Sequence, residues 1–126
     1  MVKEATVYVL DDDNSARKGL SRLLRVAGFD VFPFPNASSF LNELKPNTYG
    51  TLVTDLRMPG LSVEVLAKEL KCRKSNIKII VVSGDDDVVS KKIAKNIDAK
   101  GFFRKPVDGT ALIDTINWLL KSDNEK

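Results

Sequence analysis

Five short β-rich runs alternate with five stretches of helical periodicity, and this alternation restricts the fold of the chain more than any other feature. We expect strands at 5–10, 30–34, 50–54, 77–82 and 100–103. Between these runs, apolar residues recur every three or four positions, as in helices that pack one face against a sheet. Alternating strands and helices form a parallel sheet with right-handed crossovers and helices on both of its faces. The sequence therefore predicts a doubly wound α/β fold.

Caps and breaks delimit the expected elements. Asp13 is expected to cap the first helix, which Gly28 ends, and Asn36 is expected to cap the second. Pro33 interrupts the weak run 30–34 and lacks an N–H for a sheet hydrogen bond. We therefore expect this strand at an edge of the sheet.

The length and composition indicate one ordinary globular domain. The 126 residues suffice for one core, expected over about 5–121, with a polar tail at 122–126. A net charge of +3 with scattered Lys and Arg does not favour nucleic-acid binding. Cys72 is the only cysteine and the chain has no histidine, which excludes an internal disulfide and a Cys/His catalytic pair. With no signal peptide or membrane-spanning apolar run, we expect a cytoplasmic domain.

Chemically active side chains follow the expected strands at their carboxyl ends, where open α/β sheets bind ligands. Asp11 and Asp12 follow the first run, Asp55 the third, Ser83 the fourth and Lys105 the fifth. In the flavodoxin-like strand order 2-1-3-4-5, the first and third strands are neighbours, so their carboxylates would converge. Converging carboxylates repel one another unless a cation neutralises them, and oxygen ligands alone suit Mg²⁺ or Mn²⁺. Such a site, with a lysine and a hydroxyl, is typical of a phosphoryl group held on an aspartate.

Four motifs, each at a strand end, resemble those of response regulator receiver domains of two-component systems. They are Val9-Leu10-Asp11-Asp12-Asp13, Thr54-Asp55-Leu56-Arg57-Met58-Pro59-Gly60, Val82-Ser83-Gly84 and Phe103-Arg104-Lys105-Pro106. Each motif is weak alone, but the four in this order are highly specific, and the resemblance covers residues 6 to about 120. Arg17-Lys18-Gly19-Leu20 and the stretch after Thr54 are most similar to receivers of the FixJ type, which usually precede a helix-turn-helix output domain.

The resemblance implies a role for each residue of the acidic group. Asp55 would accept a phosphoryl group from the phosphohistidine of a sensor kinase or a phosphotransfer protein. Mg²⁺ would be held directly by Asp12, Asp55 and the backbone carbonyl of Arg57, with Asp11 acting through water. The domain would promote only its own phosphorylation and dephosphorylation, so we do not expect an enzyme that acts on a separate substrate.

The resemblance also implies a switch that reads the modification. Lys105 would pair with the phosphoryl oxygens, Ser83 and Gly84 would hydrogen-bond the group, and Phe102 would follow from an exposed to a buried rotamer. Phosphorylation adds roughly −1.5 to −2 charge, which a two-state loop can read. The fourth helix, fifth strand and fifth helix would then control a partner, an output domain for transcription, or a homodimer. Trp118, expected to be exposed on the last helix, fits such a contact surface.

Two charged residues flank the expected phosphoryl site. Arg57 lies two positions beyond Asp55, and Asp85 lies two positions beyond Ser83. We hypothesise that Arg57 and Asp85 pair across the site and shield the acyl phosphate from water. The alternative is a pair of solvated charges with almost no mutual effect.

Three alternatives remain at this stage. A phosphatase of the haloacid dehalogenase type shares an acidic first motif, but its acidic metal motif follows its lysine, whereas the run 85–87 precedes Lys105. A flavodoxin-like cofactor binder would have Ser, Thr and Gly after its first strand, and three aspartates would repel its phosphate. An interaction module that is never phosphorylated would need none of these residues, but all are present.

Overall fold

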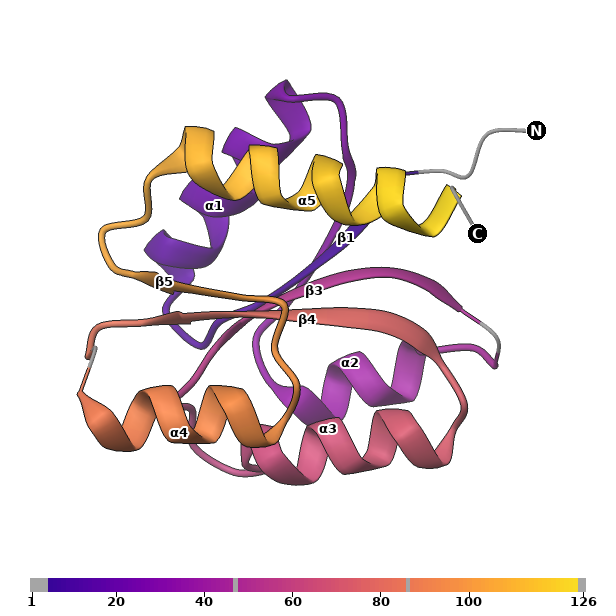
Figure 1. Cartoon of the computed structure of the whole chain (residues 1–126), viewed down its shortest axis with the longest axis vertical. Coiled ribbons are helices and arrows are strands. Elements are labelled where there is room, and N and C mark those ends of the chain that lie inside the picture. The colour runs from indigo at the N-terminus through magenta and orange to yellow at the C-terminus, as the bar shows by residue number, and fades with distance from the viewer. Residues whose placement is uncertain (1–4, 47, 86, 125–126) are drawn as a thin grey trace.

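Five parallel strands form one sheet in the order β2-β1-β3-β4-β5 in the computed structural model, which describes residues 5–46, 48–85 and 87–124 (Figure 1). The strands are β1 (Thr6–Leu10), β2 (Asp30–Phe34), β3 (Tyr49–Asp55), β4 (Asn76–Ser83) and β5 (Gly101–Arg104). The alternating helices are α1 (Asn14–Val26), α2 (Ala37–Glu43), α3 (Val63–Cys72), α4 (Val88–Asn96) and α5 (Gly109–Asn124). The predicted doubly wound α/β fold and its flavodoxin-like strand order are confirmed.

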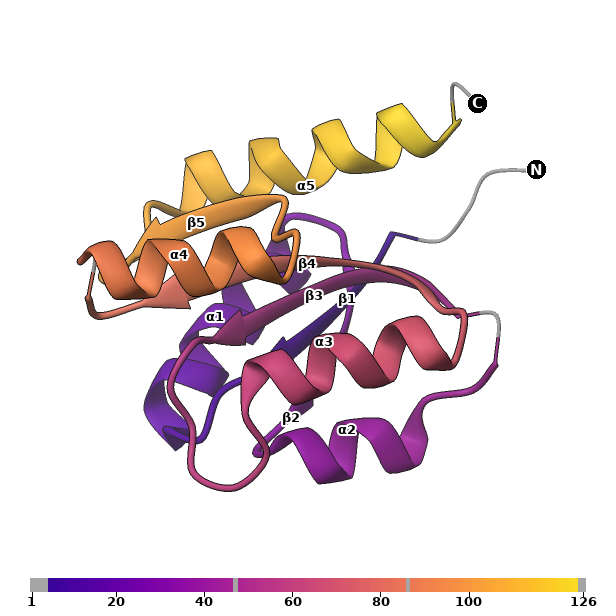
Figure 2. The same ribbon diagram turned by 60° about the horizontal axis from the view of Figure 1, so that its bottom comes forward.

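Helices cover both faces of the sheet, α1 and α5 on one side and α2, α3 and α4 on the other (Figures 1 and 2). Successive side chains of a strand point to opposite faces, so each central strand contributes to two cores. In β3, for example, Leu52 belongs to the core under α2 and α3, whereas Val53 belongs to the core under α1 and α5. This burial on both faces explains the continuous apolar runs in the sequence.

The cap residues lie where the sequence predicted them. The Asp13 side chain accepts a hydrogen bond from the Ser15 N–H, and the Asn36 side chain accepts one from the Ser39 N–H. β2 lies at an edge of the sheet, with Pro33 opposite Val9 of β1. Each cap supplies an acceptor to an N–H group that has no partner within the helix.

Some boundaries differ from the sequence expectation. β3 and β4 each extend one residue further at both ends, because Tyr49 pairs with Asn76, Asp55 with Val82 and Ser83 with Arg104 in the sheet register. β1 and β5 each begin one residue later than expected, and β5 also ends one residue later. α5 continues to Asn124 and so includes residues 122–124 of the expected polar tail, whereas 125–126 lie outside the described residues. Each residue added to an existing helix gains one hydrogen bond and fixes the backbone of only one residue. The helix can therefore extend through residues 122–124, which are weak helix formers.

The expected exposure of Trp118 is also confirmed, since 64% of this residue is exposed on α5. Within the described residues, none of the helices combines the length and the apolar character that crossing a membrane requires.

Candidate functional site

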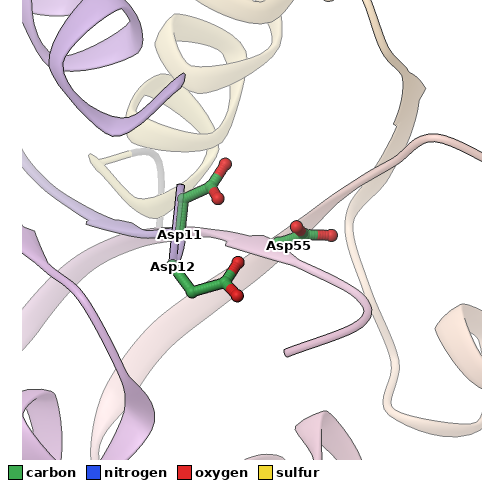
Figure 3. Close-up of side chains that lie close together, drawn as sticks. All are labelled: Asp11, Asp12 and Asp55. Atoms are coloured by element: carbon green, nitrogen blue, oxygen red, sulfur yellow. The ribbon is translucent and has the colours of Figure 1, made fainter. Parts of the chain in front are cut away.

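Three carboxylates meet at the carboxyl ends of β1 and β3 (Figure 3). The two strands are neighbours, with Leu10 opposite Thr54, so Asp11 and Asp12 follow β1 beside the last residue of β3, Asp55. One carboxylate oxygen from each aspartate lies within 4.8 Å of the others. Asp11 is buried, Asp55 is half-buried and Asp12 is exposed. The predicted convergence of these side chains therefore occurs, with Asp12 on the solvent side.

Lys105 joins two of these carboxylates from a distant strand. Its Nζ lies 3.2 Å from Oδ2 of Asp11 and 3.2 Å from Oδ2 of Asp55. Because β4 separates β5 from β3, the side chain reaches across the end of β4. The backbone N–H of Lys105 donates to the carbonyl of Ser83 over 2.8 Å. This hydrogen bond holds the backbone of Lys105 beside the end of β4.

The ion pairs determine the protonation of Lys105. Its partial burial acts to lower the pKa of the ammonium, but the charges of Asp55 and Asp11 and their hydrogen bonds outweigh this. The pKa of Lys105 therefore lies above its ordinary value, and the lysine is positively charged at neutral pH.

Backbone amides orient the two carboxylates that Lys105 contacts. The N–H of Asp13 donates to Oδ1 of Asp11 over 3.0 Å, and the N–H of Arg57 donates to Oδ1 of Asp55 over 3.3 Å. In each aspartate, one oxygen therefore accepts from the following loop while the other faces Lys105. This arrangement limits the rotation of both side chains.

Arg17 fixes the backbone at Asp11, a contact that the sequence interpretation missed. Nη1 of Arg17 donates to the carbonyl of Asp11 over 2.8 Å, and Nη2 contacts Oδ1 of Asn14. A weak signal was available, since Arg17 stands in the first turn of the helix that follows the aspartates. Its guanidinium holds the loop that carries two of the three carboxylates.

The donor set fits a hard divalent cation. Three carboxylates against one ammonium leave an excess of negative charge, and every candidate ligand atom of this group is oxygen. Mg²⁺ prefers oxygen ligands and is commonly held by one or two carboxylates together with water. The acidic group is thus typical of a magnesium site.

A charged pair lies at the exposed rim of the site. Nε of Arg57 lies 3.4 Å from Oδ2 of Asp85, and the two side chains are 58% and 59% exposed. The geometric part of the predicted pairing is therefore present. The N–H of Asp85 also donates to Oγ of Ser83 over 3.1 Å, and Ser83 itself is buried. The end of β4 is thereby linked to the loop after β3.

Arg57 makes a second contact that the sequence did not reveal. Its Nη2 donates to Oγ of Ser90 over 3.3 Å, and Ser90 is buried in the first turn of α4. The N–H of Ser90 donates in turn to Oδ1 of the capping residue Asp87 over 2.8 Å. The backbone and side-chain hydrogen bonds of Ser90 lower the pKa of Asp87, and the charge of Arg57 acts in the same direction. Arg57 therefore connects the loop after β3 to the start of α4.

Phe102 lies apart from the acidic group. It pairs with Val81 in the sheet, is half-buried and packs against the core on the side of α2, α3 and α4. Phe103 is half-buried against the opposite core. Gly84 is exposed directly after β4. The structure thus brings together Asp11, Asp12, Asp55 and Lys105, places Ser83 and Gly84 at the neighbouring strand end, and leaves Phe102 within β5.

The chain is similar to curated regulatory proteins over most of its length. It is 37% identical over 116 residues to the transcriptional regulatory protein FixJ of Azorhizobium caulinodans, covering 92% of this chain and 55% of that protein. It is 36% identical over 119 residues to the response regulator protein TodT of Pseudomonas putida F1, covering 94% and 52%. The chain therefore spans about half the length of the curated relatives that it matches.

Solved structures and a family model agree with this similarity. The response regulator StyR superposes with a TM-score of 0.86 at 39% identity, covering 98% of this chain and 62% of that one. FixJ-N superposes with a TM-score of 0.82 at 34% identity, covering 95% and 96%. The model of the response regulator receiver domain matches residues 7–117. This chain belongs to the response regulator receiver domain family and is a signalling phosphoacceptor domain of two-component systems rather than a catalytic enzyme.

Proposed function

We propose that this domain acts in the cytoplasm, where Asp55 accepts a phosphoryl group from the phosphohistidine of a sensor histidine kinase or phosphotransfer protein. The observation that supports this role is the convergence of three carboxylates and the Lys105 ammonium at one edge of the sheet. Asp55 is half-buried, and the exposed Asp12 beside it marks the solvent side from which a donor would approach. Asp11, by contrast, is buried and paired.

The transfer would replace one bond to phosphorus by another. A carboxylate oxygen of Asp55 attacks the phosphorus, the bond from phosphorus to the imidazole nitrogen breaks, and its electron pair stays on that nitrogen. The product is an acyl phosphate on Asp55. Lys105 would turn from the free carboxylate toward the phosphoryl oxygens, and its charge would stabilise them at the moment of transfer.

Asp11, Asp12 and Asp55, with the backbone carbonyl of Arg57, would hold Mg²⁺, with Mn²⁺ as an alternative. When bound, the cation would neutralise negative charge on the carboxylates and on the phosphoryl group. Arg17 would support this by holding the Asp11 carbonyl, and the N–H of Asp13 by orienting the Asp11 carboxylate.

Residues at the ends of β4 and in β5 would change their contacts when Asp55 is phosphorylated. Ser83 would give up its hydrogen bond from Asp85 and donate its hydroxyl to the phosphoryl group, together with the N–H of Gly84. Phe102 would repack against the core under α4. The face formed by α4, β5 and α5 would then control an output domain or partner, for transcription as the name of the relative FixJ indicates, or a homodimer.

Arg57 and Asp85 would set how long the acyl phosphate lasts. Their ion pair lies at the rim of the site, where it would hinder the approach of an attacking water. Both side chains are more than half exposed, so this role would come from position rather than from a strong ion pair.

The proposed acceptor is tested by incubating the protein with Mg²⁺ and acetyl phosphate and measuring its intact mass. We expect one added phosphoryl group on the wild type, none on Asp55→Asn, and one on the control Asp114→Asn, which removes an exposed carboxylate of α5. Absence of added mass would be followed by beryllofluoride binding, to separate rapid hydrolysis from failure to react. Failure of both assays would overturn the proposal in favour of an unphosphorylated interaction module.

A further inference from the structure

A hollow between α1 and β2 is lined mostly by residues whose side chains end in cationic groups. Its volume is about 560 Å³, and four cationic side chains of α1 line it, those of Arg17, Lys18, Arg22 and Arg25. No acidic residue lines it, and α1 itself contains none. The acidic site lies at the strand ends, and the lining of this hollow shares none of the three aspartates.

Two of the four cations are held in place by backbone carbonyls. Arg17 donates to the carbonyl of Asp11 over 2.8 Å, and Nη2 of Arg25 donates to the carbonyl of Val31 over 3.2 Å. Each guanidinium has five N–H donors, so further donors remain for a ligand. The two residues are eight positions apart, which is about 12 Å along a helix. The lining of the hollow therefore includes two guanidinium groups that the backbone holds in place, together with Lys18 and Arg22.

Ser21 gives an independent sign of an unmet interaction. It lines the same hollow, only 2% of it is exposed, and its Oγ has no hydrogen-bond partner within the described ranges. No other buried side-chain nitrogen or oxygen of the described residues lacks a partner. Buried hydroxyl groups are almost always satisfied, and a bridging water or a ligand oxygen at this wall of the hollow would supply the missing partner.

We propose that this hollow binds a small molecule that carries a chain of phosphate groups. Arginine forks match phosphate oxygens, and four cations along about 12 Å match a chain of charges better than one isolated anion. The volume lies within the range of small-ligand sites. Val26 and Pro33 form an apolar wall, against which a ring attached to the phosphates would pack. The site does not depend on the proposed role of Asp55.

Calorimetric titration of the full chain with sodium tripolyphosphate tests the site. The buffer is depleted of divalent metals, so the carboxylates at the strand ends repel the probe, and contains about 150 mM salt to screen diffuse attraction. We expect one saturable site, with amide NMR shifts centred on 17–26 and 31–34. Absence of saturation, or shifts centred elsewhere, would overturn the proposal.

Matched variants separate the site from net charge. Lys18→Gln/Arg22→Gln removes two cations four positions apart on α1, and Lys91→Gln/Lys95→Gln removes two exposed cations at the same spacing on α4. We expect Kd to rise at least about tenfold in the α1 variant and to stay within about twofold in the α4 variant. Equal losses in both would show that only net charge matters.

Two further probes decide the class of ligand. Orthophosphate is expected to bind at least about tenfold more weakly than tripolyphosphate, because it cannot span the fixed guanidinium groups. Equal binding would indicate an adventitious ion only. Hexaglutamate is also expected to bind more weakly, and binding as tight as that of tripolyphosphate would replace the phosphate ligand with an acidic protein segment.

Discussion

The Nζ atom of Lys105 lies 3.2 Å from Asp11 and 3.2 Å from Asp55, so one ammonium connects residues that stand 94 and 50 positions away in the chain. The pairing leaves Asp12 without a counter-charge among the described residues, although its carboxylate lies within 4.8 Å of the other two. One ammonium cannot neutralise three carboxylates, so an excess of negative charge remains in the group, and Asp12 adds to it without an ion pair of its own in the described part of the chain.

The substitution Asp12→Asn is expected to stabilise the metal-free protein by about 0.5–1 kcal/mol, because it removes a like charge from a partly solvated group. Mg²⁺ should raise the melting temperature of the wild type and have little effect on the variant, since binding to the folded state alone stabilises it. Thermal unfolding with and without Mg²⁺ measures both effects. Asp114→Asn, remote from the group, serves as the control, and a metal-free stability of Asp12→Asn below that of the wild type would contradict the prediction.

The substitution Lys105→Met is expected to lower the free energy of unfolding by about 1–2 kcal/mol in urea, since it leaves the buried Asp11 carboxylate unpaired. The loss should be smaller than for a fully buried pair because the Lys105 side chain is 32% exposed. Lys100→Met breaks an exposed ion pair with Asp98 and should cost less than about 0.5 kcal/mol. Equal losses in the two variants would show that Lys105 does not compensate a buried charge.

The difference in the free energy of unfolding between the wild type and Lys105→Met should depend on pH. The pKa of Lys105 in the folded protein is raised above its ordinary value of 10.5. The ion pairs of Lys105 therefore contribute their full stabilisation below pH 10.5, and this stabilisation is lost as the pH rises through the pKa of the folded state. The difference in stability between wild type and Lys105→Met should stay constant from neutral pH to about pH 10 and shrink above it. Tyr8, whose pKa is raised by burial and by Asp30, titrates in the same range but is present in both proteins. If the stability difference between the two proteins shrinks already near pH 8, the pKa of Lys105 is not raised.

Arg17→Met is expected to weaken Mn²⁺ or Mg²⁺ binding about threefold to tenfold, because the carbonyl of Asp11 loses the donor that holds its loop. Arg25→Met is a matched control, since Arg25 also donates to a backbone carbonyl, that of Val31, but one away from the acidic group. Titration with the metal, followed by intrinsic fluorescence or by NMR, gives the affinities of both variants. Equal affinities in the two variants would show that Arg17 does not position the site.

Asp85→Asn is expected to raise the rate of dephosphorylation severalfold, while stability changes by less than about 0.5 kcal/mol because the pair is exposed. Arg57→Glu should raise the rate as well, and it should also disturb α4 through the lost hydrogen bond to Ser90. Intact mass recorded over time after removal of the phosphodonor gives the rates. If both variants dephosphorylate at the wild-type rate, the proposed shielding is wrong.

The acidic group could be predicted from the sequence because apolar runs end abruptly at charged residues. Once the strand order is assumed, Asp11, Asp12 and Asp55 must converge, and the register of β1 with β3 bears this out. The same logic placed Pro33 in an edge strand. These features depend on the backbone path, which periodicity and turn residues specify well.

Other contacts could not be predicted, because they depend on side-chain rotamers and on packing between distant segments. The hydrogen bond from Arg57 to Ser90 joins residues 33 positions apart. The unsatisfied hydroxyl of Ser21 appears only when all neighbours are placed. The alternation of a short strand also could not tell whether Phe102 or Phe103 is core, and both are half-buried, on opposite faces.

Pro33 in β2 has a further consequence for self-association. Edge strands expose backbone groups on which another chain can extend the sheet, which leads to fibrous aggregation. Here one edge strand is five residues long and contains a proline, and the other, β5, is four residues long. Neither offers a long, regular template, so copies of this domain are expected to meet through helix surfaces and to remain free of intermolecular sheets even when concentrated.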